Sequence, residues 1–255
     1  MFATIATEHL SFSVDLTKPI DISLPLRHGE ANPNAFGVPY PTLTPLRTDR
    51  FVGNVAEGGP CNCEHLSFYP HGNGTHTECI GHITKERITI HQTVKVFHAL
   101  AALVSLAPET MQNGDMVITE RQIRVAVQHL HADISALIVR TLPNDANKPF
   151  RQYSGTNPPY LVPEAAEALA NSGIRHFLTD LPSIDREDDG GMLAAHRAFW
   201  QYDPQSLYPP RYDATITEMI FVPDMIPDGI YFLNLHIASI ESDAAPSKPV
   251  LYSLS

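Results

Sequence analysis

Residues 70–82 read PHGNGTHTECIGH and contain three histidines, one carboxylate and three glycines. In an α-helix, His76 and Glu78 would point about 200° apart, so the polar groups would scatter around the helix. In an extended strand, positions two apart share a face about 6.6 Å apart, so both side chains can reach one metal ion. We therefore expect a strand here. Gly81 must then turn the chain for His82 to join the same site, or His82 serves elsewhere.

This spacing has two interpretations. An isolated histidine in a glycine-rich loop is most often a solvated surface residue. Here His76, Glu78 and His82 form a His-x-Glu-x3-His set, and His71 precedes the set by five residues. Spacing alone leaves a metal or acid–base site and a solvated loop as open alternatives.

The chain around this segment has the composition of a folded protein. It has 255 residues, of which 43% are hydrophobic, and this is enough for a substantial core. No long Gly/Ser-rich or charged linker divides it, so residues 1–255 are expected to form one domain. The net charge of −11 would repel phosphate groups, so nucleic acid is not an expected partner.

The sequence also predicts a location and a redox state. No stretch approaches about eighteen consecutive apolar residues, so no membrane span is expected. The first residues lack the basic and apolar regions of a signal peptide, so we expect a cytoplasmic protein. Cys61, Cys63 and Cys79 are too few for a disulfide framework and are expected to be reduced thiols. A structural zinc site is a minor alternative, because Cys-x-Cys departs from the usual Cys-x2-Cys spacing and a fourth thiol is absent.

Short apolar runs bounded by Pro, Asp or Gly predict strands. They lie at residues 20–24, 135–140, 177–181 and 230–235. Helices are expected at residues 163–172, which begin with Pro163 and end before Gly173, and at residues 192–200. Residues 98–106 are equally compatible with a helix or a strand, since periodicity does not decide so short an apolar run. Strands interleaved with a few helices indicate a mixed α/β fold.

The histidine-rich segment resembles the signature of a known family, the cyclase family of metal-dependent hydrolases. The family includes bacterial kynurenine formamidase and isatin hydrolase, and its signature is His-x-Gly-Thr-His-x-Asp-x-Pro-x-His. In this sequence Gly74-Thr75-His76 matches the Gly-Thr-His core. Glu78 stands at the Asp position, and His82 matches the last His.

Two later segments agree with the same family. Asp180, Ser183 and Asp185 resemble its Asp-x-x-Ser-x-Asp strand end. His196, followed by Glu218, resembles its second ligand pair of a helical His and a later Glu. The resemblance covers roughly residues 17–250, and it implies the swivelling β/β/α architecture of this family.

The sequence also departs from the signature. The family's first His aligns with Gly72, so His71 lies one residue off register and can be a ligand only if the loop bulges. Glu78 has a side chain one methylene longer than Asp, and Ile80 replaces the Pro. These changes either retune the site or abolish it.

The resemblance implies a set of metal ligands, made of imidazole nitrogens and carboxylate oxygens. They are His71, His76, Glu78, His196 and Glu218. Such a mixed set suits Zn²⁺ or Mn²⁺ with open positions for water. The sequence does not decide between one ion and two.

The implied chemistry is hydrolysis. A bound divalent ion would lower the pKa of water toward about 7 and polarise a substrate carbonyl. His82 is the expected general base and later general acid. Ser183 and Asp185 would orient the substrate or the metal-bound histidines, or else simply cap a turn.

We expect a small-molecule substrate, and arylformamidase-like amide cleavage is the leading activity. Isatin-type ring or lactone opening is the alternative within the same mechanism. The departures from the signature also leave open a metal-binding protein without turnover. No Gly-x-Ser-x-Gly elbow, P-loop or Gly-x-Gly-x-x-Gly motif supports another catalytic class. The resemblance implies a homodimer or a larger homo-oligomer, and the Pro- and Tyr-rich residues 204–212 are the expected contact.

Overall fold

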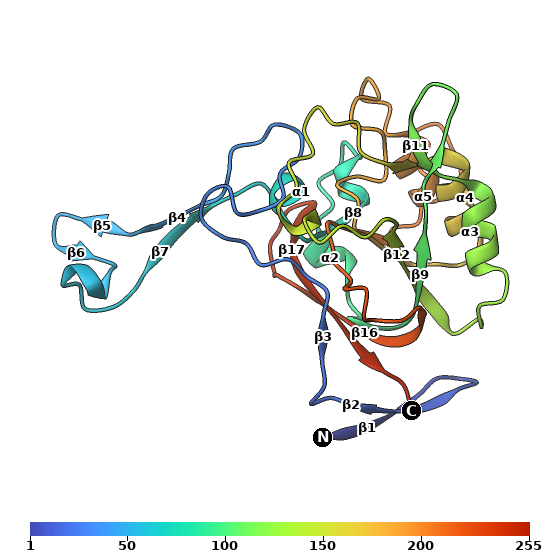
Figure 1. Cartoon of the computed structure of the whole chain (residues 1–255), viewed down its shortest axis with the longest axis horizontal. Helices are drawn as coiled ribbons and strands as arrows, with labels where there is room; N and C mark the ends of the chain where they lie inside the picture. Colours follow the sequence, from blue (N-terminus) through green and yellow to red (C-terminus); the bar gives the residue numbers. More distant parts are fainter.

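The computed structural model describes all 255 residues, and its centre is a closed β-sheet (Figure 1). The sheet runs in the order β16-β9-β12-β14-β15-β8-β17, and β17 pairs again with β16 to close the ring. These strands are β8 (His76–Cys79), β9 (His98–Leu106), β12 (Ile134–Thr141), β14 (His176–Thr179), β15 (Thr215–Glu218), β16 (Gly229–Ile237) and β17 (Ala244–Ser253). The short β3 (Ile20–Asp21) pairs with β17 outside the ring.

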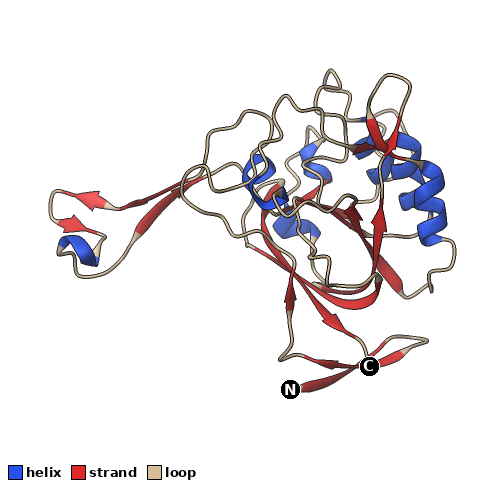
Figure 2. Cartoon of the chain, viewed as in Figure 1, coloured by secondary structure: helices blue, strands red, loops and turns tan.

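Three helices cover one side of the barrel (Figure 2). They are α3 (Glu120–Val127), α4 (Pro163–Asn171) and α5 (Ala194–Trp200). Strand β12 is apolar on both faces because Leu137 packs in the core shared with these helices, whereas Ile138 packs in the second core with β16 and β17. Burial on both faces explains the continuous apolar run of this strand.

The structure confirms the mixed α/β class, both expected helices and the four expected strand regions, with shifted ends. The ambiguous residues 98–106 form strand β9. The strand expected at residues 20–24 ends at Asp21. The N–H of Ile22 still donates to the Pro249 carbonyl of β17 at 3.2 Å, but the backbone N–H of Leu24 donates to Thr75 Oγ1 at 2.8 Å instead. A side-chain partner far along the chain therefore shortens this strand.

The remaining elements are short. Two small sheets lie outside the ring. One is formed by β1 (Phe2–Ala6) and β2 (Ser11–Asp15), and the other by β10 (Glu109–Thr110), β11 (Met116–Ile118) and β13 (Tyr160–Leu161). Two of the short helices are α2 (Ile90–Thr93), which contacts β8, and the 3-10 helix η3 (Lys148–Phe150). A hairpin arm, residues 42–67, projects from the body in Figure 1. It contains β4 (Thr42–Pro45), β5 (Arg47–Thr48), β6 (Phe51–Val52), η1 (Val55–Glu57) and β7 (Glu64–Ser67). None of the helices has the length and apolar character that crossing a membrane requires.

The three cysteines lie apart. Cys61 and Cys63 are exposed on the hairpin arm, whereas Cys79 is buried at the end of β8. All three are free thiols, and none belongs to a group of side chains that could hold a metal ion. The structure therefore does not support the structural zinc alternative.

One buried histidine outside the segments that resemble the cyclase family gives a pH prediction. His176 bonds Thr215 Oγ1 through Nδ1 at 2.9 Å, and burial lowers its pKa from 6.5 to about 4, with a further contribution from Arg175. The unfolded chain then binds a proton that the folded chain resists, so the stability that His176 contributes falls as pH drops from about 6.5 to about 4.

We therefore expect the free energy of unfolding of His176→Gln to fall less steeply than that of the wild type as the pH drops below about 6.5. The difference in unfolding free energy between wild type and variant should change by up to about 3 kcal/mol between pH 7 and pH 4. Urea unfolding at several pH values measures it, with the exposed His129→Gln as control. A difference independent of pH would contradict the prediction.

Candidate metal centre

Strand β8 carries the first two candidate ligands, His76 and Glu78, and both are completely buried. The expected extended conformation is confirmed. The antiparallel register with β15 places Glu218 directly opposite His76, and Glu218 Oε2 lies 3.4 Å from His76 Nε2. Pairing within the barrel therefore brings together two residues that lie far apart in the sequence.

Two turns return the flanking histidines to this strand. His71 lies on the short helix α1 (Pro70–Asn73), and His82 ends the 3-10 helix η2 (Ile80–His82). The two imidazole rings stack with centroids 4.3 Å apart. The turn requires Gly81, because a Cβ there would lie 1.9 Å from the carbonyl oxygen of Ile88. The glycine thus turns the chain as the extended geometry demanded.

The off-register His71 lies inside the cluster. Its Nδ1 is 3.1 Å from Glu78 Oε2. At Gly72, the position of the family's first histidine, a Cβ would come within 2.4 Å of Val38 Cγ2 and 3.0 Å of the Ala35 carbonyl. A side chain at position 72 would therefore collide with the 35–38 loop, and the neighbouring His71 supplies the imidazole instead.

Helix α5 delivers His196 from the opposite side. His196 Nε2 lies 3.0 Å from Glu78 Oε1, and its Nδ1 lies 2.5 Å from Asp185 Oδ2. Asp185 also accepts the backbone N–H groups of Ala195 and His196 at the start of the helix. Ser183 Oγ accepts the backbone N–H of Asp185 at 3.1 Å, so it has a turn-capping contact and also lines the cavity.

Each of the four histidines has one ring nitrogen in contact with a group other than Glu78 and Glu218. The outer contacts are His71 Nε2 with Asp243, His76 Nδ1 with the Gly74 carbonyl, His82 Nδ1 with Asp243, and His196 Nδ1 with Asp185. In a neutral ring that binds a metal ion, a hydrogen bond donated by the outer nitrogen directs the lone pair to the inner one. The inner nitrogens of all four therefore face the carboxylates of Glu78 and Glu218.

The donor set fits a divalent cation. His76 Nε2 and Glu78 Oε2 are buried and make no hydrogen bond of acceptable geometry, although Glu218 Oε2 lies 3.4 Å from the first and His71 Nδ1 lies 3.1 Å from the second. Such orphaned polar atoms are costly unless a ligand satisfies them. Donor atoms of His71, His76 and Glu78 lie within 4.8 Å of one another, as do those of Glu78, His82 and His196.

The charges in the cluster also favour a bound cation. Burial opposes a charge on His71, but Asp243 and Glu78 outweigh it and raise the pKa to about 10. Burial also opposes the charge on Glu78, yet the positive fields of His82 and His196 hold its pKa well below the usual range. The carboxylates thus attract positive charge into a buried site.

Sequence reasoning missed Asp243. It directly precedes β17, and its Oδ2 lies 2.8 Å from His71 Nε2 and 3.1 Å from His82 Nδ1. Its carbonyl accepts the backbone N–H of Cys79 at 3.0 Å, which anchors it beside the end of β8. Asp243 lies 161 residues beyond His82, so no local spacing indicated this contact.

The cluster opens into a cavity of about 570 Å³. His71, Glu78, His82, His196 and Glu218 line its floor, and further lining residues include Phe36, Tyr69, Ser183 and Leu193. This volume is within the range of small-molecule sites. The structure brings all the candidate site residues together. All of them except His76 line the cavity, and His76 is fully buried in the same cluster beside Glu218.

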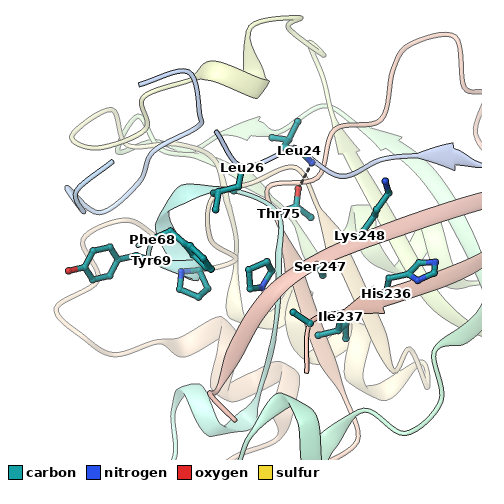
Figure 3. A pocket seen from close by; sticks show the side chains of 13 residues that line it. Leu24, Leu26, Phe68, Tyr69, Thr75, His236, Ile237, Ser247 and Lys248 are labelled. Atoms are coloured by element: carbon teal, nitrogen blue, oxygen red, sulfur yellow. Dashed lines mark hydrogen bonds between the residues drawn. The ribbon is translucent and has the colours of Figure 1, made fainter. Parts of the chain in front are cut away.

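A second cavity of about 400 Å³ lies beside Gly74 and Thr75 and shares Tyr69 and Pro70 with the first (Figure 3). Leu24, Leu26, Phe68, Ile237 and Lys248 are among the residues that line it. Thr75 faces it while accepting the backbone N–H of Leu24. None of the candidate metal ligands lines this cavity, so the first cavity is the candidate active site.

Comparison with known proteins agrees with this geometry. Residues 14–186 match the sequence model of the cyclase family. The chain belongs to the cyclase family. A kynurenine formamidase of Bacillus cereus is 25% identical over 235 residues, which make up 91% of this chain and 96% of that protein.

Solved structures share the cyclase-family fold. A structure described as a potential metal-dependent hydrolase with cyclase activity has a TM-score of 0.63 at 19% identity, covering 92% of this chain and 97% of that one. Isatin hydrolase A from Ralstonia solanacearum has a TM-score of 0.65 at 13% identity, covering 92% and 91%. The expected cyclase-like architecture is therefore confirmed.

Proposed function

We propose that this chain is a metal-dependent hydrolase that cleaves an amide bond in a small N-acyl or cyclic substrate. One observation carries the proposal. His76 Nε2 and Glu78 Oε2 are buried, make no hydrogen bond, and lie in a cluster of histidines and carboxylates beside a cavity. The similarity to kynurenine formamidases supports arylformamidase-like cleavage.

The proposed ligands keep the set expected from the sequence. They are His71, His76, Glu78, His196 and Glu218, and they would hold one or two Zn²⁺ or Mn²⁺ ions. When bound, such an ion activates water and polarises the substrate carbonyl. Two residues hold these ligands in position. Asp185 fixes the ring of His196, and the backbone N–H of Ile184 donates to Glu218 Oε1 at 2.9 Å.

His82 is the proposed general base. Its Nδ1 donates to Asp243, so its Nε2 is the free nitrogen and lies 4.0 Å from Glu78 Oε2. That atom can take a proton from the attacking water and return it to the leaving nitrogen. Ser183, at the cavity wall, is the proposed substrate contact.

Two alternative functions can be distinguished from amide hydrolysis by experiment. The isatin hydrolases among the structural neighbours favour ring or lactone opening as the runner-up. Glu78 in place of the family's Asp and the displaced His71 favour a metal-binding protein without turnover. All three proposals share the same metal centre.

Metal analysis followed by a hydrolysis panel tests them. We expect the purified chain to bind Zn²⁺ or Mn²⁺ and to hydrolyse N-formylkynurenine, and a chelator should remove this activity until metal is added back. Turnover of isatin or a lactone alone would establish the runner-up activity. Bound metal without turnover of any N-acyl, lactam or lactone compound would indicate the binder, and failure to bind either metal would overturn the proposal.

We also propose that the protein is a cytoplasmic homo-oligomer. The loop at residues 204–212 supports this as a contact because Leu207, Tyr208 and Tyr212 are exposed by 99%, 83% and 51%. Aromatic and apolar side chains of this kind are enriched at interfaces. Light scattering of the purified chain tests assembly, and cell fractionation tests the location.

A further inference from the structure

One carboxylate oxygen joins the proposed base to a proposed ligand. Asp243 Oδ2 lies 3.1 Å from His82 Nδ1 and 2.8 Å from His71 Nε2. The other oxygen, Oδ1, accepts the hydroxyl of Ser242 at 3.0 Å. Both imidazoles therefore donate to the same atom, and their rings are stacked 4.3 Å apart above it.

The backbone holds this carboxylate in place. Strand β17 pairs with β8 so that Ala244 lies opposite Glu78, and Asp243 immediately precedes this pair. Its carbonyl accepts the N–H of Cys79. The position of the Asp243 side chain is thus set by the same barrel pairing that positions the ligand strand.

We propose that Asp243 is a shared positioning residue, which fixes the ring orientation and tautomer of both His82 and His71. The proposal rests on the proposed function of the metal centre. The hydrogen bond that His82 Nδ1 donates to Asp243 keeps the lone pair on Nε2, the nitrogen on the side of Glu78. The bond to His71 Nε2 leaves Nδ1 free toward Glu78.

Asp243 acts without touching the substrate. It does not line the cavity that holds the metal centre, and it instead borders a small separate cavity with Lys85 and Arg87. Its loss should therefore slow the chemical step and weaken metal binding, while leaving the affinity for substrate nearly unchanged. This separates a positioning role from a substrate contact.

The test is a double-mutant cycle in the whole 255-residue chain at saturating Zn²⁺. Asp243→Asn should lower kcat roughly 10- to 100-fold, the usual effect of losing a partner of a functional imidazole, with KM changed by less than about threefold. Asp243→Glu should recover part of this loss because it restores the charge. The double variant Asp243→Asn, His82→Ala should be no slower than His82→Ala alone, since Asp243 acts through His82.

Zn²⁺ affinity, measured by chelator competition, gives a readout independent of turnover. Asp243→Asn should weaken it about 10-fold, and this effect should vanish in a His71→Ala background. The exposed Asp49→Asn on the hairpin arm is the control for the same chemical change. Additive losses in the cycle, or an effect on melting temperature alone, would overturn the proposal.

Three further outcomes are distinct. Loss of one metal equivalent from both Asp243→Asn and His82→Ala would make Asp243 a metal ligand and overturn its positioning role. A wild-type protein that neither binds Zn²⁺ nor hydrolyses any compound of the panel would refute the proposed function itself. Asp243→Asn with wild-type kcat and Zn²⁺ affinity would refute only the positioning role.

Discussion

Glu78→Gln should remove bound metal and activity together. Glu78 is completely buried, and its two oxygens lie 3.0 Å from His196 Nε2 and 3.1 Å from His71 Nδ1. The amide keeps the shape of the side chain but loses the negative charge, and a neutral amide is a much poorer partner for a divalent ion. We expect metal affinity to fall by more than about 100-fold, beyond the usual effect of an outer partner.

Metal content after dialysis and turnover at a fixed metal concentration measure this effect. Glu167→Gln makes the same chemical change at an exposed position on α4 and should keep both properties. If Glu78→Gln retains its metal while losing activity, Glu78 is not a ligand and acts on the substrate instead.

His82→Ala should have the opposite pattern, with metal retained and turnover lost. His82 Nε2 is 4.0 Å from Glu78 Oε2, farther than the corresponding nitrogens of His71 and His196. Removing a positioned proton-transfer group typically slows a reaction roughly 10²- to 10⁴-fold. We therefore expect kcat to fall by this factor while metal content stays near that of wild type.

The exposed His129→Ala is the matched control, and it should keep full activity. Loss of metal from His82→Ala would show that the turn at Gly81 delivers a ligand rather than a base. An unchanged rate would show that His82 has no catalytic role and is a solvated loop histidine, the alternative that the spacing alone did not exclude.

Much of the site could be predicted because it depends on local geometry. The two-residue period of a strand places His76 and Glu78 on one face whatever the rest of the chain does. The need for glycine at position 81 also follows from the spacing, and the structure supplies its reason in the close approach of Ile88. Burial on both faces likewise accounts for the apolar run at 136–139.

The order of the family motifs along the sequence predicted two further site residues, one on helix α5 and one on strand β15. His196 and Glu218 carry no local signal that joins them to His76, and only the resemblance to the cyclase family placed them in one site. The structure brings them together through helix α5 and the pairing of β15 with β8. Their roles as ligands remain predictions that metal analysis of the variants can test.

The sequence by itself determined the chemistry available at residues 70–82, because side-chain type and strand period are local properties. Only the tertiary structure decided which distant groups complete it. Closure of the barrel pairs β17 with β8 and places Asp243 against His71 and His82, and the 35–38 loop fills the space beside Gly72. Contacts between residues so far apart in the sequence depend on sheet register and loop packing, and no local pattern in a single sequence indicates them.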